Sequence, residues 1–171
     1  MAIDRRSRSV HLAVKDDETE ASAKAFLEGA LAAFPFRVTR ILTDRGSCFT
    51  AEGFERLCRE LGVEHRKTRP YTPRTNGMAE RFNGRVQREV FGITVASHRD
   101  LERLLAGFSS AYNARRQRVL GGSSPEEVVR ERLGRDTSLA NPAYRPPPDP
   151  CVVPKAMLVI ERAKDVSQPD S

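Results

Sequence analysis

Apolar and polar residues alternate at the start of the chain in the way that a half-buried β-strand requires. Val10, Leu12 and Val14 are separated by single residues, so their side chains fall on one face of an extended segment. We therefore predict that residues 1–14 form a β-hairpin, with Asp4 in its turn. Because aspartate is common in turns, we interpret Asp4 as a turn residue.

Helical periodicity follows in two segments that a short strand separates. Thr19 is expected to cap the first helix, which Pro35 ends. An apolar run predicts a strand at residues 38–43. Thr50 is expected to open the second helix, and Gly62 to end it. The inward face of the first helix is expected to consist of Ala23, Phe26, Leu27, Ala30, Leu31 and Phe34. That of the second is expected to consist of Phe54, Leu57, Cys58 and Leu61.

The next part of the chain continues the alternation of strands and helices. We predict an edge strand at residues 63–67 and an irregular loop at residues 69–75, which contain two prolines. Asn76 and Gly77 are expected to cap a helix that continues to about Phe91.

Two further helices are predicted by their capping sequences. Ser97 is followed three residues later by Asp100, and Ser124 is followed by a proline and two glutamates. The whole order, ββαβαβαα, predicts a mixed α/β sheet flanked by helices.

Length and proline content divide the chain into two parts. The 171 residues allow one domain and a tail. We predict a folded domain over residues 1–133 and a proline-rich, largely irregular tail over residues 134–171. Within the tail, residues 156–160 could pair as a strand.

Composition excludes several classes of protein. Three cysteines without metal-ligand spacing give neither a disulfide framework nor a zinc site. The charged N-terminus does not resemble a signal peptide, and no apolar run is long enough for a membrane span. We expect a soluble, cytoplasmic protein without membrane partners. His65 and His98 fit surface positions.

The net charge of +6 is concentrated in one segment. Residues 65–88 contain seven basic residues and one acidic residue, whereas the rest of the chain is balanced. A solvated helix surface is one interpretation. The other is a phosphate-facing ridge, because three of the arginines recur at helical spacing. The basic residues are Arg66, Lys67, Arg69, Arg74, Arg81, Arg85 and Arg88.

Two carboxylates are candidates for chemistry, one before this basic segment and one within it. Asp44 follows the strand at residues 38–43, and strand ends are where α/β sheets place chemistry. Glu80 is expected in the first turn of its helix, where the helix dipole favours the ionised carboxylate. Thirty-five residues separate the two.

These segments resemble the catalytic core of DDE transposases and retroviral-type integrases, in the branch of bacterial insertion-sequence transposases. The matching stretches are TDRGSCFT, RPYTPRTNGMAERFNGRV and YNARRQRVLGGSSPEEV. The resemblance implies an RNase H-like fold whose first, central strand is missing here, together with its catalytic aspartate. The sequence also departs from the family pattern at Arg45 and Met78.

The resemblance further implies transfer of DNA phosphodiester bonds with two Mg²⁺ or Mn²⁺ ions. Asp44 and Glu80 would be catalytic and metal-holding residues, and a third carboxylate is expected on the missing strand. The implied partners are DNA, as element ends and target, and further copies of the chain in a synaptic complex. The implied location is the nucleoid of a bacterial cytoplasm.

Two hypotheses of different kinds fit these features. In the first, the chain is a transposase or integrase shortened by a misplaced start or a frameshift. In the second, it is a catalytically inactive remnant that only binds nucleic acid. In both, the chain by itself is expected to be inactive, because the first catalytic aspartate is absent.

Overall fold

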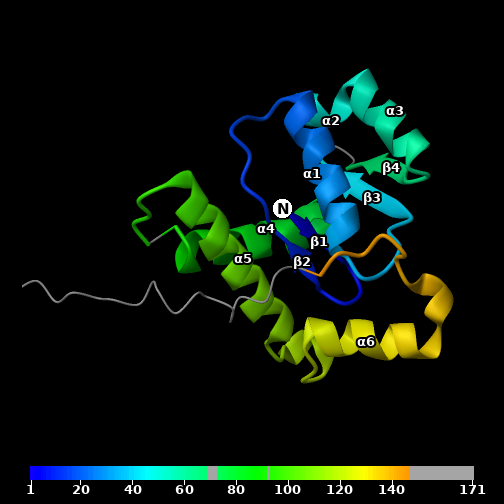
Figure 1. Cartoon of the computed structure of the whole chain (residues 1–171), viewed down its shortest axis with the longest axis vertical. Helices are drawn as coiled ribbons and strands as arrows, with labels where there is room; N and C mark the ends of the chain where they lie inside the picture. Colours follow the sequence, from blue (N-terminus) through cyan, green and yellow to red (C-terminus); the bar gives the residue numbers. More distant parts are fainter. Residues whose placement is uncertain (69–72, 92, 147–171) are drawn as a thin grey trace, which may run out of the picture.

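The computed structural model describes residues 1–68, 73–91 and 93–146, and the side chains within these ranges except those of residues 73–76. The described residues form α-helices, short 3-10 helices and two small sheets (Figure 1). None of the helices in this described part is both long and apolar enough to cross a lipid bilayer.

The chain begins with the predicted hairpin. Strand β1 (Ala2–Ile3) pairs antiparallel with β2 (Val10–His11). In the turn, Asp4 Oδ2 accepts hydrogen bonds from the backbone N–H and the hydroxyl of Ser7, each at 2.7 Å. Asp4 therefore has the turn role that the sequence indicated.

The second sheet is a parallel pair. Strand β3 (Arg40–Thr43) lies beside β4 (Glu64–Lys67), and α2 (Ser47–Thr50) and α3 (Glu52–Glu60) connect them. Gly62 ends α3 with φ +67°, as predicted. The N–H groups of Gly62 and Val63 donate to the carbonyls of Arg59 and Cys58, which is the Schellman arrangement.

The start of α3 differs from the prediction. Ala51 is the N-cap of α3, with no side-chain cap, and Thr50 is the last residue of α2. The Thr50 hydroxyl donates to the Ser47 carbonyl, and Thr50 itself is helical, so it does not have the non-helical conformation of an N-cap. The prediction that Thr50 opens this helix was wrong.

Helix α4 (Pro73–Glu89) begins earlier than Asn76 and Gly77 predicted. Proline is favoured at the first helical position because its fixed φ suits a helix and its missing N–H would have no partner there. Glu80 consequently lies about two turns inside α4 instead of in its first turn. The helix dipole therefore does not stabilise its charge. Residues 73–75 of the predicted loop are helical, and residues 69–72 lie outside the described residues.

Two clusters of buried side chains hold the fold together. The first joins the hairpin to α4 and α5 (His98–Ala114), whose N-cap is Ser97 as predicted. The second joins α3 to α1 (Glu20–Ala33), whose N-cap is Thr19, again as predicted. The buried members of the first are Val10, Phe82, Val86, Val90 and Leu105, and those of the second are Ala23, Leu27, Phe54 and Cys58.

The C-terminal part of the described chain runs back to α1. After η1 (Arg118–Leu120), helix α6 (Pro125–Arg135) starts with the predicted capping box of Ser124 and Glu127, and η2 (Thr137–Leu139) follows. The side-chain amide of Asn141 donates to the carbonyls of Leu31 and Phe34 at the end of α1.

The predicted boundary at residue 134 therefore falls inside α6, and residues up to 145 are hydrogen-bonded to the α1 region. Residues 147–171, which include the suggested strand at 156–160, lie outside the described residues. The division into two parts stays a prediction.

The described strands form two separate two-stranded sheets, one antiparallel and one parallel. They contain both kinds of pairing that a mixed sheet has, and helices pack against each of them. The predicted α/β class is confirmed.

One side chain of α5 forms hydrogen bonds with the backbone of β2. Asn113 Oδ1 accepts the N–H of Val10 at 2.9 Å, and its Nδ2 donates to the carbonyl of Val10 at 3.0 Å. Val10 is 4% exposed, so water does not readily replace these bonds.

We predict that Asn113→Ala lowers the free energy of unfolding by about 2 kcal/mol, because it leaves both backbone groups of a buried residue without partners. Urea denaturation measures the change. Asn83→Ala, in the exposed face of α4, is the matched control and should cost less than about 0.5 kcal/mol. Equal losses in the two variants would contradict this role of Asn113.

Candidate functional site

Asp44 lies immediately beyond the carboxyl end of β3 and is exposed. Its Oδ1 accepts the backbone N–H of Gly46 at 2.9 Å. A Cβ on residue 46 would lie 3.1 Å from that oxygen, closer than ordinary van der Waals contact allows. Glycine two residues after the aspartate therefore leaves room for the carboxylate to bend back to the chain. Among the described residues, no hydrogen bond to Asp44 Oδ2 is formed.

Arg45 is turned toward the neighbouring strand. Its Nε donates to the carbonyl of Thr68 at 3.1 Å, just beyond the end of β4. The backbone N–H of Thr68 in turn donates to the carbonyl of Thr43. Arg45, at which the sequence departs from the family pattern, therefore ties the two strand ends together.

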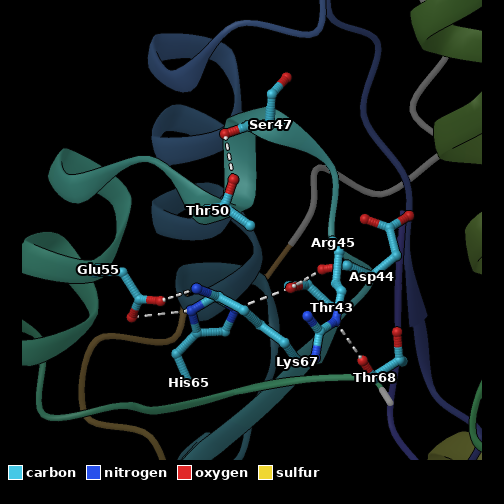
Figure 2. A network of polar contacts seen from close by, with 9 residues as sticks. All are labelled: Thr43, Asp44, Arg45, Ser47, Thr50, Glu55, His65, Lys67 and Thr68. Carbon is cyan, nitrogen blue, oxygen red and sulfur yellow. Dashed lines mark hydrogen bonds and ion pairs between the residues drawn. The ribbon is translucent and has the colours of Figure 1, made fainter. Parts of the chain in front are cut away.

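A chain of polar contacts connects α3 to the end of β3 (Figure 2). We call it the His65 network. His65 Nδ1 lies 3.1 Å from Glu55 Oε2, and Nε2 lies 2.8 Å from the hydroxyl oxygen of Thr43. That hydroxyl is 2.8 Å from the carbonyl oxygen of Asp44. Figure 2 shows the carboxylate of Asp44 pointing away from Glu55 and His65.

The number of available hydrogens fixes the direction of the bond between His65 and Thr43. The Thr43 hydroxyl has a single hydrogen, which it donates to the Asp44 carbonyl. His65 Nε2 must then donate to the Thr43 oxygen. The buried Nδ1 lies 3.1 Å from Glu55 Oε2 without an aligned hydrogen bond.

Lys67 completes the network from the same strand. Its Nζ lies 2.7 Å from Glu55 Oε1. This contact, with a smaller contribution from His65, holds the pKa of the Glu55 carboxyl below its ordinary value. Glu55 is consequently an anion at neutral pH, between one cation and one imidazole.

The prediction that His65 lies at the surface was wrong, whereas His98 is exposed as expected. The His65 side chain is 2% exposed, and Phe54 packs edge-on against its ring. The strand period could have shown this, because Val63 is apolar and every second residue after it points to the same side.

Glu80 is exposed on α4. The opposite face of the helix is buried through Phe82, Val86 and Val90, which follow one another at a spacing of four. Asp44 and Glu80 thus belong to elements of the two different core clusters, and their convergence at one metal stays a prediction. In residues 1–68, 73–91 and 93–146, no three His, Cys, Asp or Glu residues are grouped to hold a metal ion.

Several of the predicted DNA-binding residues have acidic partners within the protein. Arg66 contacts Glu64 at 2.6 Å, and Lys67 contacts Glu55. Arg85 contacts Glu89 at 3.2 Å and lies over the ring of Tyr112. Two of these partners, Glu64 and Glu89, lie one residue outside the segment that was counted as strongly basic.

Arg81 and Arg88 differ from these three. Both are exposed, and neither forms an ion pair with any side chain that the structure describes. Their guanidinium groups lie along α4, near Gly77 and Gly84. Arg69 and the side chain of Arg74 lie outside the described residues. Among the predicted DNA-binding residues whose side chains are described, Arg81 and Arg88 are therefore the two most available to a phosphate.

Two models of known families match the chain, and both are described as the integrase core domain. One matches residues 1–73 and the other residues 61–125. The putative transposase InsD for insertion element IS2E of Escherichia coli (strain K12) is 32% identical over 98 residues, which cover 53% of this chain and 43% of that protein.

The Gag-Pol polyprotein of bovine immunodeficiency virus (strain R29) is 31% identical over 98 residues, covering 56% of this chain and 6% of the polyprotein. The chain therefore spans less than half the length of either curated relative. The crystal structure of the catalytic core domain of BIV integrase superposes with a TM-score of 0.60 and 24% identity, over 79% of this chain and 86% of that one.

The structural likeness shows the fold, which is RNase H-like as expected. The two family models together cover residues 1–125, including Asp44, Glu80 and the basic segment. Residues 1–125 of the chain are similar to the integrase core domain.

Proposed function

We propose that this chain is the core part of a DNA transposase or integrase that cleaves and joins phosphodiester bonds with divalent metal ions. The observation that carries the proposal is the position of Asp44, exposed at the carboxyl end of a parallel strand. Ligands of open α/β sheets bind outside these strand ends. The segment that contains Asp44 is also matched by an integrase core model.

Asp44 and Glu80 are proposed as catalytic residues and as ligands of Mg²⁺ or Mn²⁺. Their oxygen donors suit hard cations, and Mg²⁺ commonly keeps several waters while it binds one or two carboxylates and substrate phosphates. Two carboxylates and a DNA phosphate therefore fit such an ion. When bound, the ions would stabilise charge on the attacking and leaving oxygens.

The contribution of the chain itself is orientation. Asp44 uses Oδ1 to accept the Gly46 N–H, which restrains the carboxylate and leaves Oδ2 for another ligand. Glu80 is carried by a helix that three buried side chains hold in place. Rigid elements of this kind keep ligands within the narrow tolerance that metal binding requires.

The proposed DNA surface consists of the basic residues around these carboxylates, with DNA as element ends and as target. Exposed Arg81 and Arg88 support it most directly, and Arg66, Lys67 and Arg85 would exchange an internal carboxylate for a phosphate. The ion pairs of Arg66 and Arg85 lie at the surface, where such pairs are weak in water, so their exchange costs little. Arg69 and Arg74 complete the set by sequence. Several copies would bring two DNA ends together, in the bacterial nucleoid.

A second candidate function is nucleic-acid binding without cleavage. It is favoured by the same two exposed arginines, because contacts from Arg81 and Arg88 to phosphates need no metal ion. The two candidates differ in what the carboxylates do, since only the first requires Asp44 and Glu80 to bind a metal.

We predict that Asp44→Asn and Glu80→Gln each weaken Mn²⁺ binding at least about tenfold, because each removes one of two anionic ligands. Electron paramagnetic resonance of free Mn²⁺ measures the affinity, in the absence and presence of a short DNA duplex. Binding should be tighter with DNA, whose phosphates supply further oxygens.

Glu52→Gln is the matched control, because it removes an exposed carboxylate from the first turn of α3. Its Mn²⁺ affinity should equal that of the unmodified chain. If the three variants bind Mn²⁺ equally well, the metal assignment fails, and binding without cleavage becomes the better account.

A separate prediction concerns DNA affinity. Arg81→Gln with Arg88→Gln should reduce the slope of log K against log salt by about 0.9 for each lost phosphate contact, or roughly 2 in total. Fluorescence anisotropy with a labelled duplex at several salt concentrations measures this slope.

The control is Arg130→Gln with Arg135→Gln, which removes the same charge from exposed positions on α6. In Figure 1, α6 lies along the lower edge of the molecule, away from α4. A change of slope that is equal in both double variants would show that net charge, and not the face of α4, governs binding.

A further inference from the structure

We propose that His65 is a positioning residue for Asp44, acting through Thr43 and supported by Glu55. The inference rests on the proposed function in one respect only, that Asp44 is a metal ligand. The route from His65 to Asp44 is visible in the structure without that assumption (Figure 2).

His65 occupies a position where an apolar residue would ordinarily pack. In the register of the two strands it lies opposite Ile41, and its ring faces Phe54, one of the most buried side chains of the second core cluster. Burying a polar ring costs free energy unless its nitrogens have partners. Apolar side chains of similar volume commonly replace buried polar pairs without loss of stability.

The partners of His65 lead to the candidate site. Nε2 holds the Thr43 hydroxyl, which holds the carbonyl oxygen of Asp44. On the other side of the ring, Glu55 is fixed in turn by Lys67. The His65 ring is 2% exposed and Phe54 packs edge-on against it, so the ring cannot rotate freely and its Nε2 sets the direction of the Thr43 hydroxyl.

The backbone of Asp44 needs such support because its own side chain is in solvent. Residue 43 is the last of β3, and the chain bends at Asp44 into α2. Beyond the strand pairing, the Thr43 hydroxyl and the Arg45 contact to Thr68 hold this bend. Metal ligands lose affinity when the groups that orient them are removed, although those groups never touch the metal.

The Gly46 amide is a local reporter of the Asp44 carboxylate, since it donates to Oδ1 at 2.9 Å. We expect Thr43→Val and His65→Leu to accelerate hydrogen exchange of this amide about five- to tenfold, the factor that corresponds to losing one hydrogen bond. His65→Gln, whose amide nitrogen can still donate to Thr43, should stay near the exchange rate of the unmodified chain. Water-exchange NMR on the ¹⁵N-labelled chain, without metal, measures these rates.

Thr50→Val is the matched control. It removes a nearby hydroxyl that also donates to a backbone carbonyl, that of Ser47, but that lies outside the His65 network. Its Gly46 amide should exchange as in the unmodified chain. Amides of α1 and α3 serve as the internal reference for global stability in every variant.

Two results would overturn the inference. One is an unchanged Gly46 exchange rate in Thr43→Val and His65→Leu. The other is an acceleration that affects α1, α3 and Gly46 alike, which would make His65 a stabilising residue of the core and nothing more.

The same samples separate this inference from the proposed function. Added Mn²⁺ should broaden the resonances of residues 43–46 in the unmodified chain, not in Asp44→Asn, and at about tenfold higher concentration in His65→Leu. One outcome would overturn the positioning role and leave the metal site standing. In it, broadening is lost in Asp44→Asn but requires the same Mn²⁺ concentration in His65→Leu as in the unmodified chain. Absence of broadening in the unmodified chain would remove the metal site, while the Gly46 exchange rates would still decide whether His65 positions Asp44.

Discussion

The parallel pairing of β3 with β4 is the contact on which the candidate site depends. Four residues of each strand are in register, from Arg40 opposite Glu64 to Thr43 opposite Lys67. The two strands therefore end at the same level, and Asp44 emerges beside Thr68. A slip of one residue would turn His65 to solvent and bring Arg66 inward, because successive side chains alternate between faces. The register thus decides both the composition of the inner face and the place where the carboxylate leaves the sheet.

Charge has a different role on each face of this strand pair. On the outer face, Glu64 contacts both Arg40 and Arg66, and these two guanidinium groups hold the pKa of the carboxyl below its ordinary value. These groups are in water, where such contacts are weak and easily exchanged. On the inner face, the His65 side chain is 2% exposed, whereas Glu55 and Lys67 beside it are 30% and 32% exposed. The outer charges can therefore serve an external ligand more readily than the inner ones.

Local signals in the sequence were sufficient for some elements and insufficient for others. Gly62 and the Ser124 capping box specify helix ends through a few neighbouring residues, so both were predicted correctly. The start of α4 was misplaced because two capping signals, Pro73 and Asn76, compete within one turn, and the proline prevailed. The position of Asp44 at a strand end followed from the apolar run before it.

The interior of the site was harder to predict because its contacts join distant parts of the chain. His65 was assigned to the surface by its polarity, although the alternation from Val63 places it inward. Glu55 and Thr43 gave no signal, since their roles arise only when α3 and β3 meet β4. The charge count of residues 65–88 treated Arg66 and Arg85 as free, whereas their partners are Glu64 and Glu89.

The amide of Asn141 has a consequence for the order in which the protein is made. It satisfies two carbonyls at the end of α1, and it follows those carbonyls in the chain by 110 and 107 residues. Ribosomes add about 5–20 residues per second, so roughly 5–20 s would pass between the synthesis of α1 and that of Asn141. During that interval the last turn of α1 bonds to water and is free to fray. Completion of this helix therefore comes well after the synthesis of the helix itself.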